Sequence, residues 1–160
     1  MSSVSLKQSL VDNHSIRLNE TAATWQEGVL KAVAPLVESG AVEPRYGEAI
    51  IRSTEKFGPY YVLMEGMAMP HARPEDGVCR DAFSLITLEK PVSFSDGKRV
   101  EVLLALAATS SDIHTGIAIP QIVALFEIEG IIEKLQAARN AEDVLHLIDG
   151  ADVSKYLSKE

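Results

Sequence analysis

Two segments of the chain are apolar at nearly every position, and they define the centre of the predicted fold. They are residues 82–88 (AFSLITL) and residues 100–108 (VEVLLALAA). A strand that is covered on both faces has such a continuous apolar run, so we expect two central strands. Between them the dipeptide Asp96-Gly97 supplies residues that favour a tight hairpin turn. The pattern therefore favours an antiparallel pairing of these two strands.

Two helices are predicted before these strands. Thr24 and Glu27 have the spacing of a capping box, and apolar residues then recur at helical spacing over residues 25–37. Pro35 predicts a kink or an early end of this helix, and Gly40 closes the segment. The first helix is therefore expected to begin directly after Thr24.

The second helix is expected to start with Pro44 as its first residue and to stop before Gly58-Pro59. Its predicted apolar face consists of Tyr46, Ala49, Ile50, Ser53 and Phe57. Residues 60–64 follow as a short β-prone run that leads into Gly66. We interpret this run as the first clear strand of the chain.

The last third of the chain has helical patterns. These are residues 118–126, which contain Pro120, residues 131–138, and a helix that Asn140 caps and that runs to about Ile148. Because strands are preceded and followed by helices, the predicted class is α/β, a layered sandwich with a central mixed β-sheet flanked by helices on both faces. We expect one domain over residues 1–160, with about ten frayed residues at the start.

Composition narrows the functional classes. The formal charge of -8 and the pI near 5.0 argue against a general binder of nucleic acid or anionic membranes, because both surfaces would repel the protein. The single cysteine, Cys79, cannot form an internal disulfide. No segment has the length and apolarity of a signal peptide or a membrane span. We expect a cytoplasmic protein without direct membrane insertion.

One histidine stands out by its surroundings. His71 lies between Pro70 and Pro74 in residues 66–75 (GMAMPHARPE). Proline fixes its own φ and disfavours helix for the preceding residue, so this segment is stiff and not helical. It also follows a strand-like run, and α/β sheets tend to place their sites on such loops. His71 is therefore the first candidate for chemistry.

His114 is the expected companion of His71. It follows the second apolar run, so two junctions between a strand and a loop in one sheet could bring the two imidazoles together. The alternative is two unrelated loop histidines. His14 lies among polar turn formers and His146 at a solvated helix position, and we assign no function to either.

Residues 66–77 (GMAMPHARPEDG) closely resemble the phosphohistidine motif of the enzyme IIA components of the bacterial sugar phosphotransferase system, in the mannitol-fructose class. Residues 112–114 (DIH) occupy the place of that family's second active-site histidine. The ascorbate-specific branch in particular is resembled by residues 25–27 (WQE), 57–60 (FGPY) and 120–126 (PQIVALF).

The resemblance implies a phosphocarrier. His71 would accept a phosphoryl group from the phosphocarrier protein HPr and pass it to a cysteine of a IIB component during carbohydrate uptake, with a membrane IIC component involved only indirectly and no cofactor. His114 could donate a hydrogen bond to the phosphoryl oxygens. Loop amides near Ser110 and Ser111 are further candidate donors.

Two arginines near the motif are ambiguous. Arg73 could pair with phosphoryl oxygens, or it could form a surface salt bridge to Glu75 or Asp76. Arg52 does not match the spacing of the helix arginine that supports the phosphoryl group in the mannitol branch, so its role stays unassigned. This departure argues against mannitol as the substrate.

Two other functions remain open. A regulatory IIA protein, resembling the nitrogen-related branch, would signal through its phosphorylation state instead of serving transport. A metal hydrolase would use His71, His114 and a carboxylate such as Asp112, but the chain has no HxH or HxxxH spacing.

Overall fold

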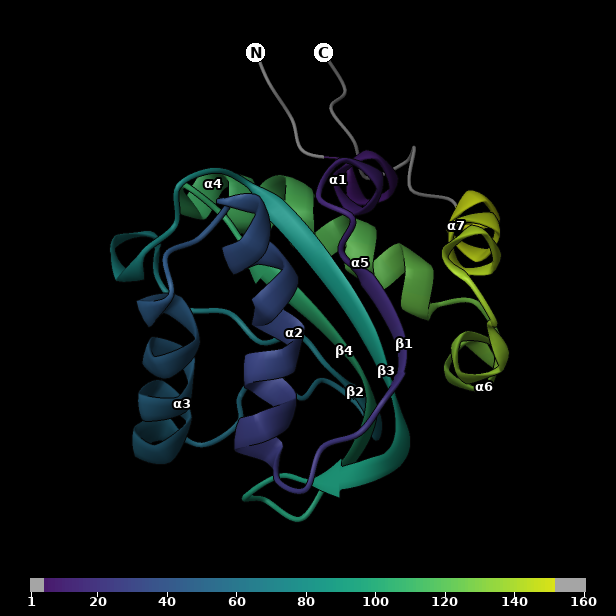
Figure 1. The fold of residues 1–160 in the computed structure, drawn as a ribbon, viewed down its shortest axis with the longest axis horizontal. Helices are drawn as coiled ribbons and strands as arrows, with labels where there is room; N and C mark the ends of the chain where they lie inside the picture. The colour runs from purple at the N-terminus through teal and green to yellow at the C-terminus, as the bar shows by residue number, and fades with distance from the viewer. Residues whose placement is uncertain (1–4, 152–160) are drawn as a thin grey trace.

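The computed structural model describes residues 5–151, which form a four-stranded mixed sheet covered by helices (Figure 1). The strand order is β1-β3-β4-β2. β3 and β4 pair antiparallel, whereas β1 is parallel to β3 and β2 is parallel to β4. The strands are β1 (Ile16–Glu20), β2 (Gly66–Ala68), β3 (Ala82–Ser93) and β4 (Arg99–Ala107).

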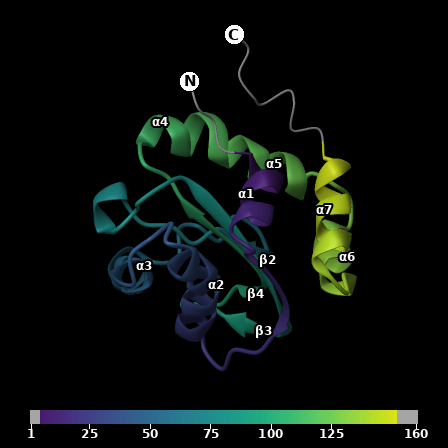
Figure 2. The same cartoon turned by 45° about the horizontal axis from the view of Figure 1, so that its top comes forward.

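Helices lie on both faces of this sheet. α2 and α6 both contact β3 and β4, and the two views show α2 and α3 on one side and α6 and α7 on the other (Figures 1 and 2). The predicted layered α/β class is thus confirmed. The helices are α1 (Leu6–Asp12), α2 (Trp25–Ser39), α3 (Arg45–Phe57), a 3₁₀ turn η1 (Pro74–Asp76), α4 (Ser111–Ile113), a π-helical turn η2 (His114–Ala118), α5 (Ile119–Phe126), α6 (Ile131–Ala137) and α7 (Ala141–Asp149).

The two apolar runs form the predicted antiparallel pair. Every residue of 82–88 is buried, and Leu85 lies opposite Leu104 in the register. β3 is longer than its apolar run, because it continues past Pro91 to Ser93 after a register shift between Thr87 and Val92. The long β3–β4 pair therefore forms the centre of the sheet.

The capping signals predict helix starts well. The Thr24 hydroxyl accepts from the Glu27 amide at 3.2 Å, and the Glu27 carboxylate accepts from the Ala23 amide at 2.7 Å. The expected early end at Pro35 is wrong. α2 continues to Ser39, because Pro35 is buried in the packed helix and this packing offsets the hydrogen bond that proline cannot donate.

The start of the chain is more ordered than predicted. α1 buries Leu6 and Leu10, and the Leu6 amide donates to the side chain of Gln121 at 2.8 Å. The fraying expected for the first ten or so residues is therefore wrong for residues 5–10, and the rest of that prediction lies outside the described residues. The strand β1 precedes α2, although the sequence pattern does not predict it. Its five residues lack a fully buried position, which weakens the apolar signal.

The strand expected at residues 60–64 is also wrong. The Val62 amide donates to the Pro59 carbonyl at 3.0 Å in a turn, and the strand begins only at Gly66. The apolar residues of this segment form no ladder: Tyr61 and Val62 are buried in the core, whereas Leu63 and Met64 are exposed. Phe57, predicted on the core face of α3, is likewise exposed, and Thr54 is buried there instead.

The predicted helices of the last third are present. Pro120 lies in the first turn of α5, and the Asn140 side chain accepts from the Asp143 amide at 2.9 Å to cap α7. Within residues 5–151 no single helix is long and apolar enough to cross a membrane, and only the bent pair Ser111–Phe126 and Ile131–Ala137, at 85°, meets that test by length and composition.

Gly66 provides a test of how β2 packs. Its φ is +101°, and a Cβ there would lie 2.6 Å from Cδ1 of Ile132. We expect Gly66→Ala to lower the free energy of unfolding by about 2–4 kcal/mol, because backbone strain adds to overpacking. Gly97→Ala is the matched control, since its φ of +88° is similar but no atom lies within 4 Å. It should cost only about 1–2 kcal/mol of strain in urea unfolding. Equal losses in both variants would contradict this packing.

Candidate functional site

The segment that carries His71 is held to the sheet by its backbone. The Met69 amide donates to the Tyr61 carbonyl at 3.0 Å, and the Pro70 carbonyl accepts from the Leu106 amide at 3.0 Å. Leu106 lies at the end of β4. The predicted stiff loop is therefore anchored on both sides of Pro70, which aims the next side chain reproducibly.

Tyr46 of α3 completes this anchoring. Its fully buried hydroxyl donates to the Leu106 carbonyl at 2.6 Å and accepts from the Ala72 amide at 3.0 Å. Burial raises the pKa of Tyr46 well above its ordinary value, so the hydroxyl keeps its proton. One side chain thus joins α3, β4 and the residue after His71. The sequence pattern placed Tyr46 in the core but did not indicate this polar role.

The hydrogen bond of the imidazole identifies its unprotonated nitrogen. Nδ1 of His71 lies 2.8 Å from the Met69 carbonyl oxygen. A carbonyl can only accept, so Nδ1 carries the proton. In the neutral ring the lone pair is then on Nε2. The residue as a whole is only partly buried.

The surroundings keep this ring neutral. The pKa of His71 is lowered to about 4: burial is the main cause, the hydrogen bond to the Met69 carbonyl partly opposes it, and the neighbouring His114 adds to the lowering. Burial also lowers the pKa of His114. At neutral pH, His71 is therefore a neutral nitrogen nucleophile.

The sheet topology brings the two histidines together. Their ring centroids are 4.5 Å apart, with the planes at 51°. His71 follows β2 and His114 follows β4, and these strands are parallel neighbours, so their ends lie at the same edge of the sheet. The expected juxtaposition is confirmed, and the alternative of two unrelated loop histidines is wrong.

Two aromatic rings border His71, and the sequence reasoning assigned neither to the site. Tyr60 and Tyr61 meet its ring edge-on at centroid distances of 5.5 and 6.2 Å. The Tyr61 hydroxyl lies 2.5 Å from Oγ1 of Thr54, and burial raises the pKa of Tyr61 to about 12. Tyr60 is half-exposed, and its hydroxyl donates weakly to the His71 carbonyl at 3.4 Å. In the sequence, the sign of these aromatic neighbours was the run at residues 57–60 (FGPY).

The other predicted donors occupy less direct positions. Arg73 is exposed and forms the predicted alternative, ion pairs to Asp76 at 3.4 Å and to Glu75 at 3.8 Å. The Ser110 hydroxyl caps α4 by accepting from the Ile113 amide at 3.2 Å. Ser111 is exposed in the first turn of that helix.

A metal site is not assembled here. Among residues 5–151, no group of three or more His, Cys, Asp and Glu side chains could hold a metal ion. The hydrolase hypothesis built on His71, His114 and Asp112 thus lacks its ligand set in the described part of the chain. His14 and His146 are both exposed.

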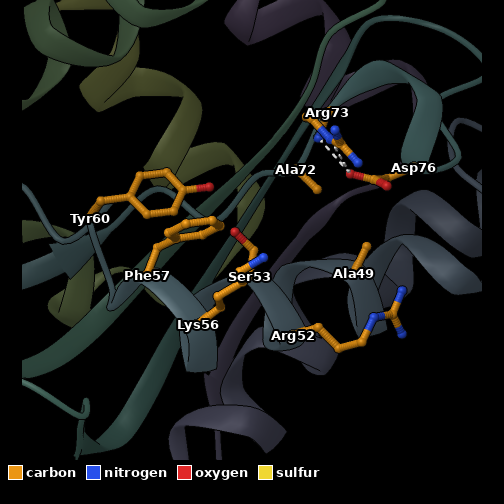
Figure 3. Close-up of a pocket in the computed structure, with 9 residues that line it drawn as sticks. All are labelled: Ala49, Arg52, Ser53, Lys56, Phe57, Tyr60, Ala72, Arg73 and Asp76. Carbon is orange, nitrogen blue, oxygen red and sulfur yellow. Dashed lines mark hydrogen bonds and ion pairs between the residues drawn. The ribbon is translucent and has the colours of Figure 1, made fainter.

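Arg52, unassigned from the sequence, lines a cleft beside the histidine loop. Figure 3 shows α3 along one wall, with Arg52 and Lys56, and the loop after His71 along the other, with Arg73 and Asp76. The cleft has a volume of about 810 Å³.

Comparison with known proteins supports the motif-based interpretation. Residues 9–151 match the model of the family described as "Phosphoenolpyruvate-dependent sugar phosphotransferase system, EIIA 2". The chain is 49% identical to the ascorbate-specific EIIA component of Salmonella typhimurium over 146 residues, which cover 90% of this chain and 95% of the relative.

Solved structures agree. A protein described as a phosphotransferase-system IIA component from Streptococcus mutans has a TM-score of 0.94 and 60% identity, covering 97% of this chain and 99% of its own. The mannitol IIA protein of Escherichia coli, solved in complex with phosphorylated IIB, has a TM-score of 0.72 and 28% identity, covering 85% and 94%.

The low pKa of His71 predicts a pH effect on stability. The unfolded ring binds its proton near pH 6.5, whereas the folded ring binds it only near pH 4. The unfolded state therefore holds more protons between these values, and stability falls as the pH drops through this window, by up to about 3 kcal/mol. NMR titration should find the His71 pKa near 4. His71→Asn can still donate to Met69 but does not titrate, so its stability should fall less. Equal slopes would contradict the assignment.

Tyr46→Phe tests the anchoring of the histidine loop. It leaves the Leu106 carbonyl and the Ala72 amide without their partner, so we expect a loss of about 1–3 kcal/mol in urea unfolding. The loosened loop should admit water and raise the NMR-measured pKa of His71. Tyr60→Phe is the control, because its hydroxyl is exposed and its bond is long. Similar effects in both variants would show that Tyr46 does not position the loop.

Proposed function

The chain belongs to the EIIA 2 family of the phosphoenolpyruvate-dependent sugar phosphotransferase system, and from this membership we propose that His71 is its phosphoryl carrier and His114 its assistant. The observation that carries the proposal is the state of the His71 ring. Its Nδ1 donates its proton to the Met69 carbonyl, which leaves Nε2 unprotonated. The centroids of the His71 and His114 rings are 4.5 Å apart.

The proposed transfer balances without a proton acceptor. The Nε2 lone pair forms a bond to phosphorus while the nitrogen–phosphorus bond of phospho-HPr breaks, and that electron pair returns to the donor ring. The phosphorylated ring of His71 carries more positive charge, which strengthens the bond from Nδ1–H to Met69. In the second step a cysteine thiolate of the IIB component attacks phosphorus, and the bonding pair returns to Nε2.

Donors around the phosphoryl group would stabilise the charge on its oxygens. We assign His114 this role through a ring N–H. Arg73 could join it by leaving Asp76, since an exposed ion pair contributes only about 0–1 kcal/mol. Backbone amides near Ser110 and Ser111 are the remaining proposed donors, because they lie just before His114 in the chain.

The partners follow from the same proposal. HPr would be the donor and a IIB component the acceptor, in the cytoplasm, with an ascorbate-like carbohydrate transported by the system. Support comes from the relative named as ascorbate-specific, which matches over 90% of this chain. The same match is our reason to propose transport in place of regulation through the phosphorylation state.

Phosphoryl uptake tests the site. With phosphoenolpyruvate, enzyme I and HPr, the wild type should gain one acid-labile phosphoryl group by intact mass, and His71→Asn should gain none. His114→Ala should still be labelled, but about tenfold to a hundredfold more slowly, since one donor to the phosphoryl group is lost. His14→Asn, at an exposed position, should behave as the wild type. Label retained in His71→Asn would overturn the assignment.

A further inference from the structure

The cleft beside the histidine loop has a charge unlike that of the rest of the chain. Its walls carry three cationic side chains, Arg52, Lys56 and Arg73, against one carboxylate, Asp76. The whole chain has a formal charge of -8. A positive pocket in an acidic protein attracts groups that the remaining surface repels.

Two of the three cations are not neutralised. Arg73 is paired with Asp76 and Glu75. In the part of the chain that the structure describes, Arg52 and Lys56 have no carboxylate partner, and the Lys56 ammonium lies 5.2 Å from the centroid of the Phe57 ring. Both come from one face of α3, one helical turn apart. They are therefore available to an external anion.

The cleft adjoins the loop that carries His71. Tyr60 lines the cleft, while its ring contacts His71 and its hydroxyl donates to the His71 carbonyl. Ala72, the next residue, also lines it. The acceptor proposed above can therefore contact this cleft while it presents its cysteine to Nε2 of His71.

The rim has the composition of a protein docking surface. Phe57 and Tyr60 are 69% and 50% exposed, and Figure 3 shows both rings at one end of the cleft. Exposed aromatic rings beside arginine are enriched at protein interfaces. Leu63 and Met64 extend the exposed apolar surface along the same segment.

We propose that this cleft binds carboxylate side chains of the IIB component and so orients the acceptor over His71. The inference rests on the proposed function. An acidic acceptor approaches when this chain already carries the phosphoryl dianion, so repulsion at His71 is greatest in that step. Arg52 and Lys56 offset it locally and set the orientation. The solved complex of the mannitol IIA protein with phosphorylated IIB shows that such an assembly forms in a relative.

Charge reversal separates this role from the chemistry. The double variant Arg52→Glu/Lys56→Glu should weaken binding of the unphosphorylated chain to IIB by about tenfold or more. It should slow transfer from the phosphorylated chain to IIB by a similar factor. The loss should lie mainly in the association rate constant, which should also depend less on salt than in the wild type. Uptake from phospho-HPr and the hydrolysis rate of the phosphohistidine should change less than about threefold. Lys134→Glu on the distant helix α6 is the matched control and should leave both transfers unchanged (Figure 1).

The outcomes distinguish the two proposals. Unchanged binding to IIB in the double variant, with normal phosphoryl uptake, would overturn the cleft proposal alone. An equal loss in the HPr and IIB steps, or faster phosphohistidine hydrolysis, would also overturn it, because the cations would then act on both partners or on the phosphoryl group itself. Weakened binding to IIB in a protein whose wild type takes up no phosphoryl group would support the cleft and refute the carrier function.

Discussion

The hydrogen bond from Nδ1 of His71 to the Met69 carbonyl is the constraint on which the site depends. It sets the tautomer and leaves the lone pair on Nε2, and it restrains the ring through the 2.8 Å contact between Nδ1 and the carbonyl oxygen. The bond is only as reliable as the backbone that presents the carbonyl. That backbone is held by hydrogen bonds from the Met69 amide to Tyr61 and from the Leu106 amide to Pro70. The position of the ring is therefore tied to the sheet.

The histidine loop is held in place because backbone groups of this irregular segment have hydrogen-bond partners. Residues 69–72 belong to no helix or strand, yet the Met69 amide, the Pro70 carbonyl and the Ala72 amide each have a partner. A buried peptide group without a partner would cost about 1–3 kcal/mol. The hydroxyl of Tyr46 supplies two of the hydrogen bonds, because it donates to Leu106 and accepts from Ala72. These two residues are 34 positions apart in the chain. The irregular loop is thus as well specified as a strand.

The electrostatics of the molecule divide into three zones. The chain as a whole is acidic, the histidine pair is kept neutral by burial, and the cleft along α3 is cationic. A neutral ring beside cations suits the phosphoryl transfer that we propose, because no positive or negative charge on the ring has to be displaced and nothing at Nε2 repels a dianion. The proposed transfer needs no strong base.

Local patterns determined much of this protein. The sequence shows the buried runs at 82–88 and 100–108, the Thr24 and Asn140 caps and the stiff histidine segment, because each depends on neighbours within a few residues.

Only the tertiary structure decided the rest. α1 and β1 exist because Leu6, Leu10 and the backbone of Ser15 find partners far along the chain, which no local pattern reports. The meeting of His71 with His114 required β2 and β4 to be parallel neighbours, and the position of Arg52 in a cleft required a loop 20 residues further on, around Ala72, to face α3. Pairing over such separations is a property of the whole packed chain, so its consequences appear only after folding.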